Sequence, residues 1–473
     1  MNELDKTLND VFPGFVVRKD LAGEVKGSSQ VPTYVLEYLL AQYAASDDEA
    51  VIRQGTEDVR AILSEHYVDP ANAQLVRSRI LERGRYKVID KVTVRVNEKN
   101  QTYEAHFQNL NLSGVEVDSY TVTQNEKLLV GGVWCLVDLE HYGGQDPNLG
   151  SPWVMGGLKP IQMSNFNMDA YLEGRARFDS KQWLDVLIQS IGLDPSFFTT
   201  RGKLLQLTRL IPYVENNYNL VELGPKGTGK SHIYTEFSPH GMLVSGGEVT
   251  VPKLFVNNAT RQVGLVGYWD VVAFDEFAGQ GKRVDKALVD IMKNYMANRS
   301  FSRGTDIHTA SASMAFIGNT SSTVPYMLKN TDLFQDLPDA YHDSAYLDRV
   351  HFYLPGWEID PIRGELFTTG YGFVVDYLAE AFKALRKQDY SNRYRDHFTL
   401  DPQISTRDRE AIHKTFSGLM KLLHPNGEAS KDEIEELLRF AVEGRKRVKD
   451  QIVRLDPTMH EVPFAYKDGS GAQ

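Results

Sequence analysis

The sequence is poor in the residues that build disulfide frameworks, metal clusters and membrane spans. Cys135 is the single cysteine among 473 residues, which excludes an internal disulfide and a cysteine-based zinc cluster. It lies in the apolar run 128–139, so we expect a buried side chain rather than a reactive thiol. No run of 18 or more apolar residues occurs. Residues 1–10 are polar and acidic, unlike a secretory signal or transit peptide, so a cytoplasmic protein without membrane contact is expected.

Other catalytic patterns are also missing. The sequence has no HExxH, no serine–histidine–aspartate pattern and no metal-like spacing among its 12 histidines. The net charge of −11 counts against a broad surface that coats nucleic acid. It does not exclude a ring with an acidic exterior and a basic channel, because local charge governs phosphate contact.

The chain changes character in blocks, which predicts a multidomain α/β plus β protein. Apolar residues recur at helical spacing early on, and from Tyr86 their period changes to two. Four or five short strands in about 55 residues predict a small antiparallel barrel or sandwich, with an OB-like module as the natural candidate. The predicted blocks are an N-terminal helical region (1–84), the OB-like β module (85–150), a helical connector (151–204), an α/β core with a parallel sheet (205–365), a helical lid (366–456) and a tail or linker (457–473).

A glycine-rich loop follows a strand-like apolar segment in the α/β block. The segment 218–223 is followed directly by residues 224–231, which match all eight positions of the P-loop pattern. The order of strand, loop and helix is the one that this motif requires. Glycines let backbone N–H groups converge on phosphate oxygens, and the helix N-terminus adds partial positive charge. We therefore predict an ATP site in which Lys230 reaches the β- and γ-phosphates and Ser231 holds Mg²⁺. The predicted nucleotide-binding residues of the loop are Gly224, Pro225, Lys226, Gly227, Thr228, Gly229, Lys230 and Ser231.

Two acids end the next candidate strand. Asp275 and Glu276 follow the apolar residues 271–274. A hydrolysing P-loop enzyme needs a carboxylate there to organise magnesium, so Asp275 is the predicted metal residue. Glu276 is the predicted catalytic residue that orients and polarises the attacking water.

Three further polar residues are candidates for the same chemistry. Asn319 ends the apolar strand 313–318 and is predicted to hold the attacking water as sensor 1, although an asparagine can simply open a turn. Arg349 is predicted to reach the nucleotide of an adjacent subunit, the alternative being a surface ion pair with Asp348 or a neighbouring residue. Arg407, or its neighbour Arg409, is predicted to be the lid arginine (sensor 2), the alternative being a solvated helix face.

The candidate DNA contacts are isolated cations in loops. Each brings one or two charges that a solvated turn would also explain, but in a ring each would repeat in every subunit and form a charged belt. The segment 301–304 is expected to be the tip of a hairpin just before the Asn319 strand. The predicted DNA-binding residues are Lys253, Lys282, Arg283 and Arg303.

Several of these segments resemble one family. The segments 222–231, 272–279, 314–319 and 345–358 look like the Lon-like AAA+ ATPases of bacterial BREX phage-defence systems, the BrxL family, and 14–21, 31–40 and 129–142 are similar to it as well. The resemblance spans nearly the whole chain. It implies an AAA+ fold with a helical lid, ring assembly, DNA binding and a role in defence against phage. The context of Arg349 also resembles Lon proteases, and the order of β module, ATPase core and hairpin resembles minichromosome-maintenance helicases.

The family usually carries a Lon-protease-like domain after the lid. This sequence ends at Gln473 in a linker-like tail, so the protein is either naturally short or truncated. No serine–lysine dyad can be assigned, and no protease activity is expected from this chain.

Three functions remain open at this point. The first is an ATP- and Mg²⁺-dependent AAA+ ring motor that binds DNA, expected to be double-stranded. Its expected assembly is a hexamer-like ring, single or stacked as a double ring, with other defence-system proteins as partners. The second is a protein remodeller or unfoldase related to Lon ATPase modules. The third is a scaffold that binds ATP to assemble but hydrolyses it slowly, against which the Asp275–Glu276 pair argues.

Overall fold

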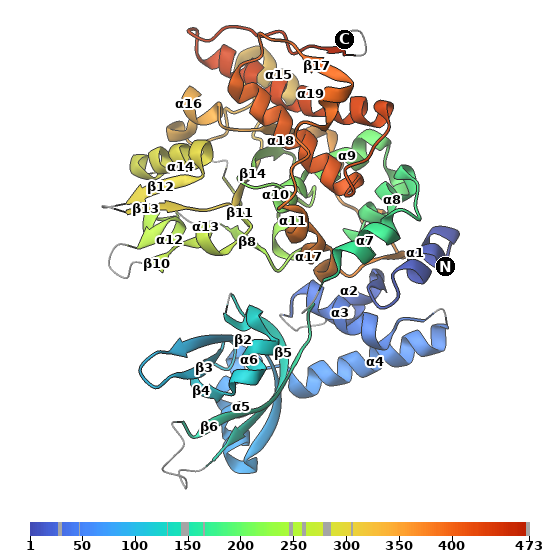
Figure 1. Ribbon diagram of the computed structural model, residues 1–473, viewed down its shortest axis with the longest axis vertical. Coiled ribbons are helices and arrows are strands. Elements are labelled where there is room, and N and C mark those ends of the chain that lie inside the picture. The colour runs from blue at the N-terminus through green and yellow to red at the C-terminus, as the bar shows by residue number, and fades with distance from the viewer. Residues whose placement is uncertain are drawn as a thin grey trace. The chain divides into compact units, whose positions relative to one another are not determined.

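The computed structural model describes residues 1–26, 31–46, 48–129, 131–142, 151–163, 166–245, 249–257, 262–277, 285–303 and 306–469. These residues form two compact units, and each unit is described by itself below. The first comprises Met1–Asn167 and Thr368–Leu378, and the second comprises Met168–Phe367 and Ala379–Gln473. Figure 1 labels most of the helices and strands of both.

The first unit begins with helices that pack beside a two-stranded sheet. Strand β1 (Val16–Arg18) pairs antiparallel with β16 (Tyr371–Phe373), which comes from the range 366–456 that was predicted to form a helical lid. A buried ion pair between Lys19 and Glu37 secures this pairing, because Lys19 also donates to the carbonyl of Phe373 and Glu37 accepts the N–H of Val375. The helices of this part are α1 (Glu3–Val11), α2 (Asp20–Lys26), α3 (Thr33–Tyr43), α4 (Glu49–His66), α5 (Ala73–Arg83) and the start of α17 (Val375–Leu385).

A closed five-stranded barrel completes the first unit. The strands are β2 (Arg85–Asn97), β3 (Thr102–Phe107), β4 (Leu112–Val117), β5 (Val133–His141) and β6 (Trp153–Pro160), with α6 (Ser119–Gln124) between β4 and β5. Their order around the barrel is β2-β3-β4-β6-β5, and β4 and β6 pair in parallel whereas the other pairs are antiparallel. Strand β6 follows the range 85–150 predicted for this module. Its two glycines weakened the strand pattern, and a Cβ on Gly156 would lie 2.6 Å from the Glu140 carboxylate, so that this side chain would have to shift.

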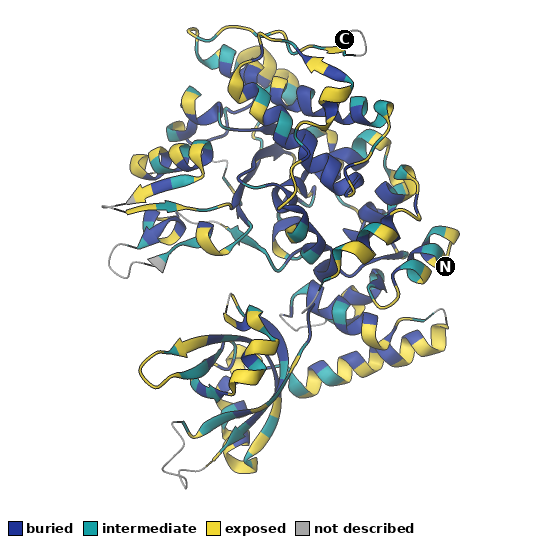
Figure 2. Cartoon of the chain, in the orientation of Figure 1, coloured by how far each residue is buried: buried dark blue, intermediate teal, exposed yellow. Residues whose placement is uncertain are grey.

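The second unit is built on a parallel sheet. Strands β7 (Asn219–Gly224), β8 (Gly241–Val244), β11 (Val271–Phe274), β14 (Ser313–Asn319) and β15 (Phe352–Pro355) lie in the order β15-β7-β14-β11-β8. Every neighbouring pair is parallel, which confirms the expected arrangement. Strand β7 lies between β15 and β14 and is buried over its whole length. Figure 2 shows the middle of this unit in the dark blue of buried residues. The carboxyl ends of all five strands therefore meet at one edge, where ligand sites of such sheets form.

Helices and small sheets surround this core. The helices are α7 (Met168–Arg175), α8 (Ser180–Ser190), α9 (Thr200–Thr208), α10 (Ile211–Val214), α11 (Lys230–Thr235), α12 (Val251–Leu254), α13 (Leu265–Tyr268), α14 (Lys286–Asn298), α15 (Val324–Asn330), α16 (Ser344–Leu347), α18 (Thr406–Leu423) and α19 (Lys431–Leu455). The remaining strands pair antiparallel as β9 (Val256–Asn257) with β10 (Gln262–Val263), β12 (Ser300–Arg303) with β13 (Asp306–Thr309), and β17 (Phe398–Leu400) with β18 (Tyr466–Asp468). Among the described residues, no helix has the length and apolar character needed to cross a membrane.

Strand β18 lies within the range 457–473 that was predicted to be a tail or linker. Tyr466 packs edge-on against Phe398, and Lys431 pairs with Asp468 at 2.5 Å. The local sequence of β18 is polar and short, so its place depends on partners from distant segments, among them β17 and these side chains.

Candidate nucleotide-binding site

The P-loop connects β7 to α11 with the backbone that its glycines were expected to supply. Gly227 and Gly229 adopt φ values of +79° and +75°, a region in which only glycine is unstrained. Gly224 lies against Gly356, so that a Cβ on it would approach the Gly356 carbonyl carbon to 2.6 Å. A Cβ on Gly229 would lie 2.4 Å from the Cδ1 atom of Ile362. Each of these three glycines is therefore required by local geometry.

Lys230 begins α11 and lies against the loop. Its ammonium donates to the carbonyl oxygen of Pro225 and, at 3.3 Å, to the hydroxyl of Thr228. Burial lowers the pKa of Lys230, and the carboxylate of Glu222 partly opposes this shift. A buried lysine at a helix N-terminus adds its charge to that of the converging N–H groups, which suits the binding of phosphate.

Ser231 and Asp275 meet although they are far apart in the sequence. The Ser231 hydroxyl donates to Oδ2 of Asp275 at 2.7 Å. A hydroxyl and a carboxylate at one point supply the oxygen ligands that Mg²⁺ prefers, so these residues fit the predicted metal site. Asp275 follows the buried strand β11, which places its carboxylate at the carboxyl edge of the sheet.

Glu276 is exposed and adopts a strained backbone. Its φ is +51°, which is unusual for a residue with a side chain, and its N–H donates to Oδ1 of Asp275 at 2.8 Å. Strain of this kind concentrates at functional sites, because the surrounding structure must hold it. The conformation is consistent with the catalytic role predicted for Glu276, which stays a prediction.

Asn319 lies at the same edge. In the sheet it is the register partner of Gly224, the first P-loop residue, and its side chain is exposed. The next residue, Thr320, donates its N–H to the carbonyl of Gly224 at 3.1 Å. The structure therefore brings the P-loop, Asp275, Glu276 and Asn319 together, as the sequence predicted.

Arg349 lies at the opposite edge of the sheet. The side chain of Asn219, the first residue of β7, donates to the backbone carbonyl of Arg349 at 3.0 Å. The P-loop starts at the other end of that strand, and five strand residues span about 16 Å. The Arg349 side chain is half-buried, and its Nε has no hydrogen-bond partner within the described part of the chain. Burial lowers the pKa of Arg349, and the nearby positive charge of Arg407 lowers it further.

Asp348 does not pair with Arg349, although the sequence left that alternative open. It instead accepts from Arg407 at 2.8 Å and from Arg445 at 2.7 Å. Arg445 is fully buried, and it also donates to Asp408 at 2.7 Å. Arg407 therefore lies close to Arg349, which follows Asp348 in the sequence. The contact with Asp348 puts Arg407 at the amino edge of the sheet, away from the P-loop of its own chain, and its predicted role as the lid arginine stays a prediction.

The predicted DNA contacts are not brought together by the described residues. Lys253 is exposed on α12. Arg303 ends β12, in register with Asp306 of β13, and this pairing confirms the hairpin expected just before the Asn319 strand. Lys282 and Arg283 lie outside the described residues.

Sequence reasoning missed two features of this site. The segment after β15 lies against the P-loop, where Ile362 donates its N–H to the carbonyl of Gly227 at 2.8 Å. Arg209 forms a buried ion pair with Glu222 of β7, just before the loop. A carboxylate inside the mainly apolar strand segment 218–223 was the sequence signal for the second feature.

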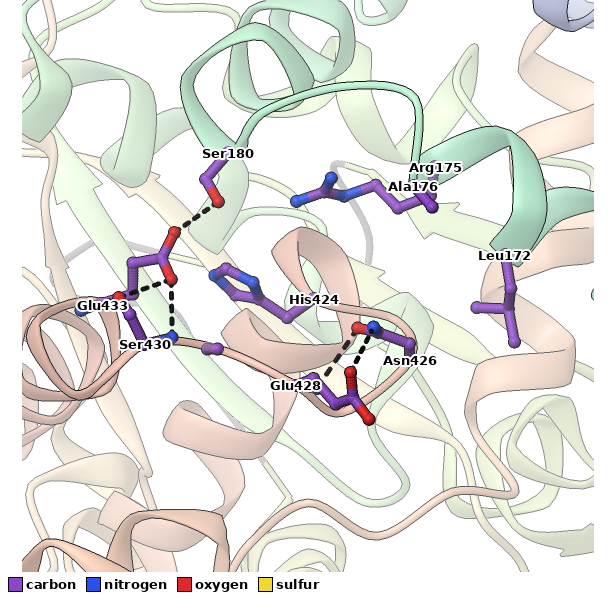
Figure 3. A pocket seen from close by; sticks show the side chains of 10 residues that line it. Leu172, Arg175, Ala176, Ser180, His424, Asn426, Glu428, Ser430 and Glu433 are labelled. Atoms are coloured by element: carbon purple, nitrogen blue, oxygen red, sulfur yellow. Dashed lines mark hydrogen bonds between the residues drawn. The ribbon is translucent and has the colours of Figure 1, made fainter.

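A separate cleft of about 340 Å³ lies in the second unit, where α7 and α8 face the loop between α18 and α19 (Figure 3). Its polar groups largely bond to one another. Glu433 accepts from the hydroxyls of Ser180 and Ser430, and these bonds lower its pKa to about 2 although burial opposes them. Arg175 donates to backbone carbonyls. None of the residues predicted from the sequence lines this cleft.

Comparison with known proteins identifies similar sequences along nearly the whole chain. A family model described as "Lon-like protease BrxL-like, ATPase domain" matches residues 153–464, which contain every residue of the candidate site. A second model, "BREX system Lon protease-like protein BrxL N-terminal", matches residues 10–141. A Lon-like protease BrxL of Bacillus cereus (strain H3081.97) is 48% identical over 470 residues, covering 99% of this chain and 69% of that protein. One of Escherichia coli O9:H4 (strain HS) is 48% identical over 467 residues, covering 98% of this chain and 67% of that protein.

Proposed function

The chain belongs to the BrxL family of Lon-like proteins, whose ATPase domain it contains, and from this premise we propose that it is an AAA+ ring motor. It hydrolyses ATP with Mg²⁺, binds DNA and acts in bacterial defence against phage. The names of its relatives refer to the BREX system, and other proteins of that system are its proposed partners. The contact between Ser231 and Asp275 beneath the P-loop carries the proposal, because it unites a phosphate-binding loop with a metal-binding carboxylate.

Each residue at the carboxyl edge of the sheet has a proposed role. The N–H groups of residues 224–231 and the Lys230 ammonium bind the β- and γ-phosphates of ATP. Ser231 and Asp275 hold Mg²⁺, which neutralises charge on the phosphate oxygens. Glu276 polarises the attacking water and Asn319 keeps that water in line.

Arg349 supports assembly into a ring. It lies about 16 Å from the P-loop of its own chain, and its partly desolvated guanidinium has an unused donor at Nε within the described structure. A guanidinium so placed can stabilise the γ-phosphate bound to an adjacent subunit. We propose a hexamer-like ring, single or stacked in pairs, with ATP between subunits.

The β module and the hairpin are the proposed DNA-contacting parts. The five-stranded barrel, with β4 parallel to β6, supports an OB-like module, and such modules bind oligonucleotides. The β12–β13 hairpin, with Arg303 near its tip, and Lys253 add cations that repeat around a ring.

The first experiment replaces Glu276. In Glu276→Gln we expect ATP binding to persist and turnover to fall by about a hundredfold or more, because the amide cannot polarise water. Asp290→Asn is a matched control, since Asp290 is an exposed acid on α14 that pairs with Lys293. Steady-state phosphate release and calorimetric titration with ATP measure the two quantities. Wild-type turnover in Glu276→Gln would refute the assignment.

The second experiment separates a DNA motor from an unfoldase. ATPase activity is measured with duplex DNA and with an unfolded protein, each at rising salt. Stimulation by DNA that declines steeply with salt supports the proposal, because phosphate contacts release counterions. Stimulation by unfolded protein alone supports the remodeller instead.

A further inference from the structure

A buried ion pair lies behind the P-loop. Arg209 follows α9, and Glu222 lies on β7 two residues before Gly224. Their side chains make two parallel hydrogen bonds, from Nε to Oε2 at 3.0 Å and from Nη2 to Oε1 at 2.5 Å. Arg209 is 1% exposed and Glu222 is fully buried. A pair desolvated this far carries a large electrostatic cost, which the two-pronged geometry offsets.

The guanidinium of this pair lies directly beside the last glycine of the loop. Its Nη1 is 3.9 Å from the position that a Cβ on Gly229 would occupy. The same nitrogen donates to Oε1 of Gln206 at 2.8 Å, which fixes the plane of the guanidinium. Three of the five N–H donors of Arg209 are thus used, and the other two have no acceptor among the residues that the structure describes.

Stability alone does not explain this arrangement. Replacement of a buried ion pair by apolar residues of similar volume is often neutral or stabilising. The pair instead lies next to the loop, since Arg209 is close to Gly229 and Gly229 precedes Lys230.

We propose that Arg209 and Glu222 are positioning residues that hold the P-loop ready for a nucleoside triphosphate. The inference rests on the proposed function of this loop and extends it to two residues that do not touch the ligand. Groups that support a binding site from behind set its geometry, and a loop displaced by a fraction of an ångström loses phosphate contacts. The pair therefore sets nucleotide affinity rather than fold stability.

The test replaces both charges at once. The double variant Arg209→Met with Glu222→Leu removes the pair without leaving an unpaired charge. We expect the thermal unfolding midpoint without nucleotide to stay the same or rise, and the Kd for ATP with Mg²⁺ to increase about tenfold, an effect within the range of couplings between contacting residues. Isothermal titration calorimetry measures the affinity. The double variant Lys421→Met with Glu215→Leu is the matched control, because it removes another buried pair of this unit, with an N–O distance of 2.7 Å.

The outcomes are distinguishable. If the double variant folds and binds ATP within about twofold of the wild type, the positioning role is wrong while the proposed function stands. If the wild-type protein itself does not bind ATP, the proposed function fails first. If the double variant does not fold, Arg209→Lys takes its place, because lysine keeps the charge but cannot make the two parallel bonds. Weaker ATP binding by that folded variant supports the role, and unchanged affinity overturns it.

Discussion

The two edges of the parallel sheet in the second unit, where its strands end and where they begin, carry different chemical groups. At the carboxyl edge, the P-loop offers converging N–H groups, and Ser231 contacts Asp275 at 2.7 Å. At the amino edge, Arg407 and Arg445 are held by Asp348, and Arg349 lies beside them. One edge can bind a phosphate with its metal ion, whereas the other presents cations about 16 Å away along β7. The proposed hydrolytic site combines the P-loop groups of one chain with Arg349 of a neighbour, which is why the proposal places ATP between two copies of the chain.

The largest expected effect comes from replacing Arg349 at the amino edge, which should lower the rate of ATP turnover. In Arg349→Ala we expect ATP affinity to persist and turnover to fall by about a thousandfold, because an arginine supplied to a transferring phosphate contributes on that scale. Mixing this variant with Lys230→Ala should restore part of the activity, since some subunit pairs then contain one intact site. Phosphate release as a function of mixing ratio is the measurement. Absence of recovery from assembled mixtures would place Arg349 outside the neighbour's site.

Replacing Arg445 tests whether its ion pairs with Asp348 and Asp408 stabilise the amino edge of the sheet. Arg445→Met leaves Asp408 and Asp348 without their buried partner, and we expect a loss of about 3 kcal/mol or more in unfolding free energy. Lys446→Met, next to it on α19, removes an exposed pair with Asp450 and should cost less than about 1 kcal/mol. Denaturant titration followed by tryptophan fluorescence compares the two variants. Equal losses would contradict a structural role for the network.

Replacing Arg407 has the smallest expected effect, and it tests whether this residue contacts the nucleotide bound to its own chain. Its side chain is half-exposed, and its pair with Asp348 leaves Asp348 still bound to Arg445. In Arg407→Ala we expect the Kd for ATP to change by less than about threefold, because the residue lies away from the P-loop of its own chain. Calorimetry at concentrations where the protein is monomeric measures that intrinsic affinity. A tenfold loss of ATP affinity would indicate that Arg407 contacts the nucleotide bound to its own chain, as sensor 2.

The sequence was most informative where local pattern and chemistry coincide. The P-loop residues 224–231 must follow a strand and open a helix, so their location could be predicted, and Asp275 and Asn319 followed as polar ends of apolar strands. Strand β6 could not be placed in the barrel, because Gly156 and Gly157 hide its period. The position of Arg407 relative to the sheet could not be predicted, because a helix pattern does not show which end of the sheet the helix meets.

The sequence by itself determined the family, the position of the phosphate loop and the identity of the acids that follow β11. These depend on contiguous residues, whose conformation local sterics and hydrogen bonding set. Only the tertiary structure decided that Ser231 contacts Asp275, that Asp348 pairs with Arg407 and Arg445 rather than Arg349, and that Arg209 lies beneath Gly229. Which residues become partners depends on how segments distant in the sequence pack together, because a buried charge is paired with an opposite charge nearby.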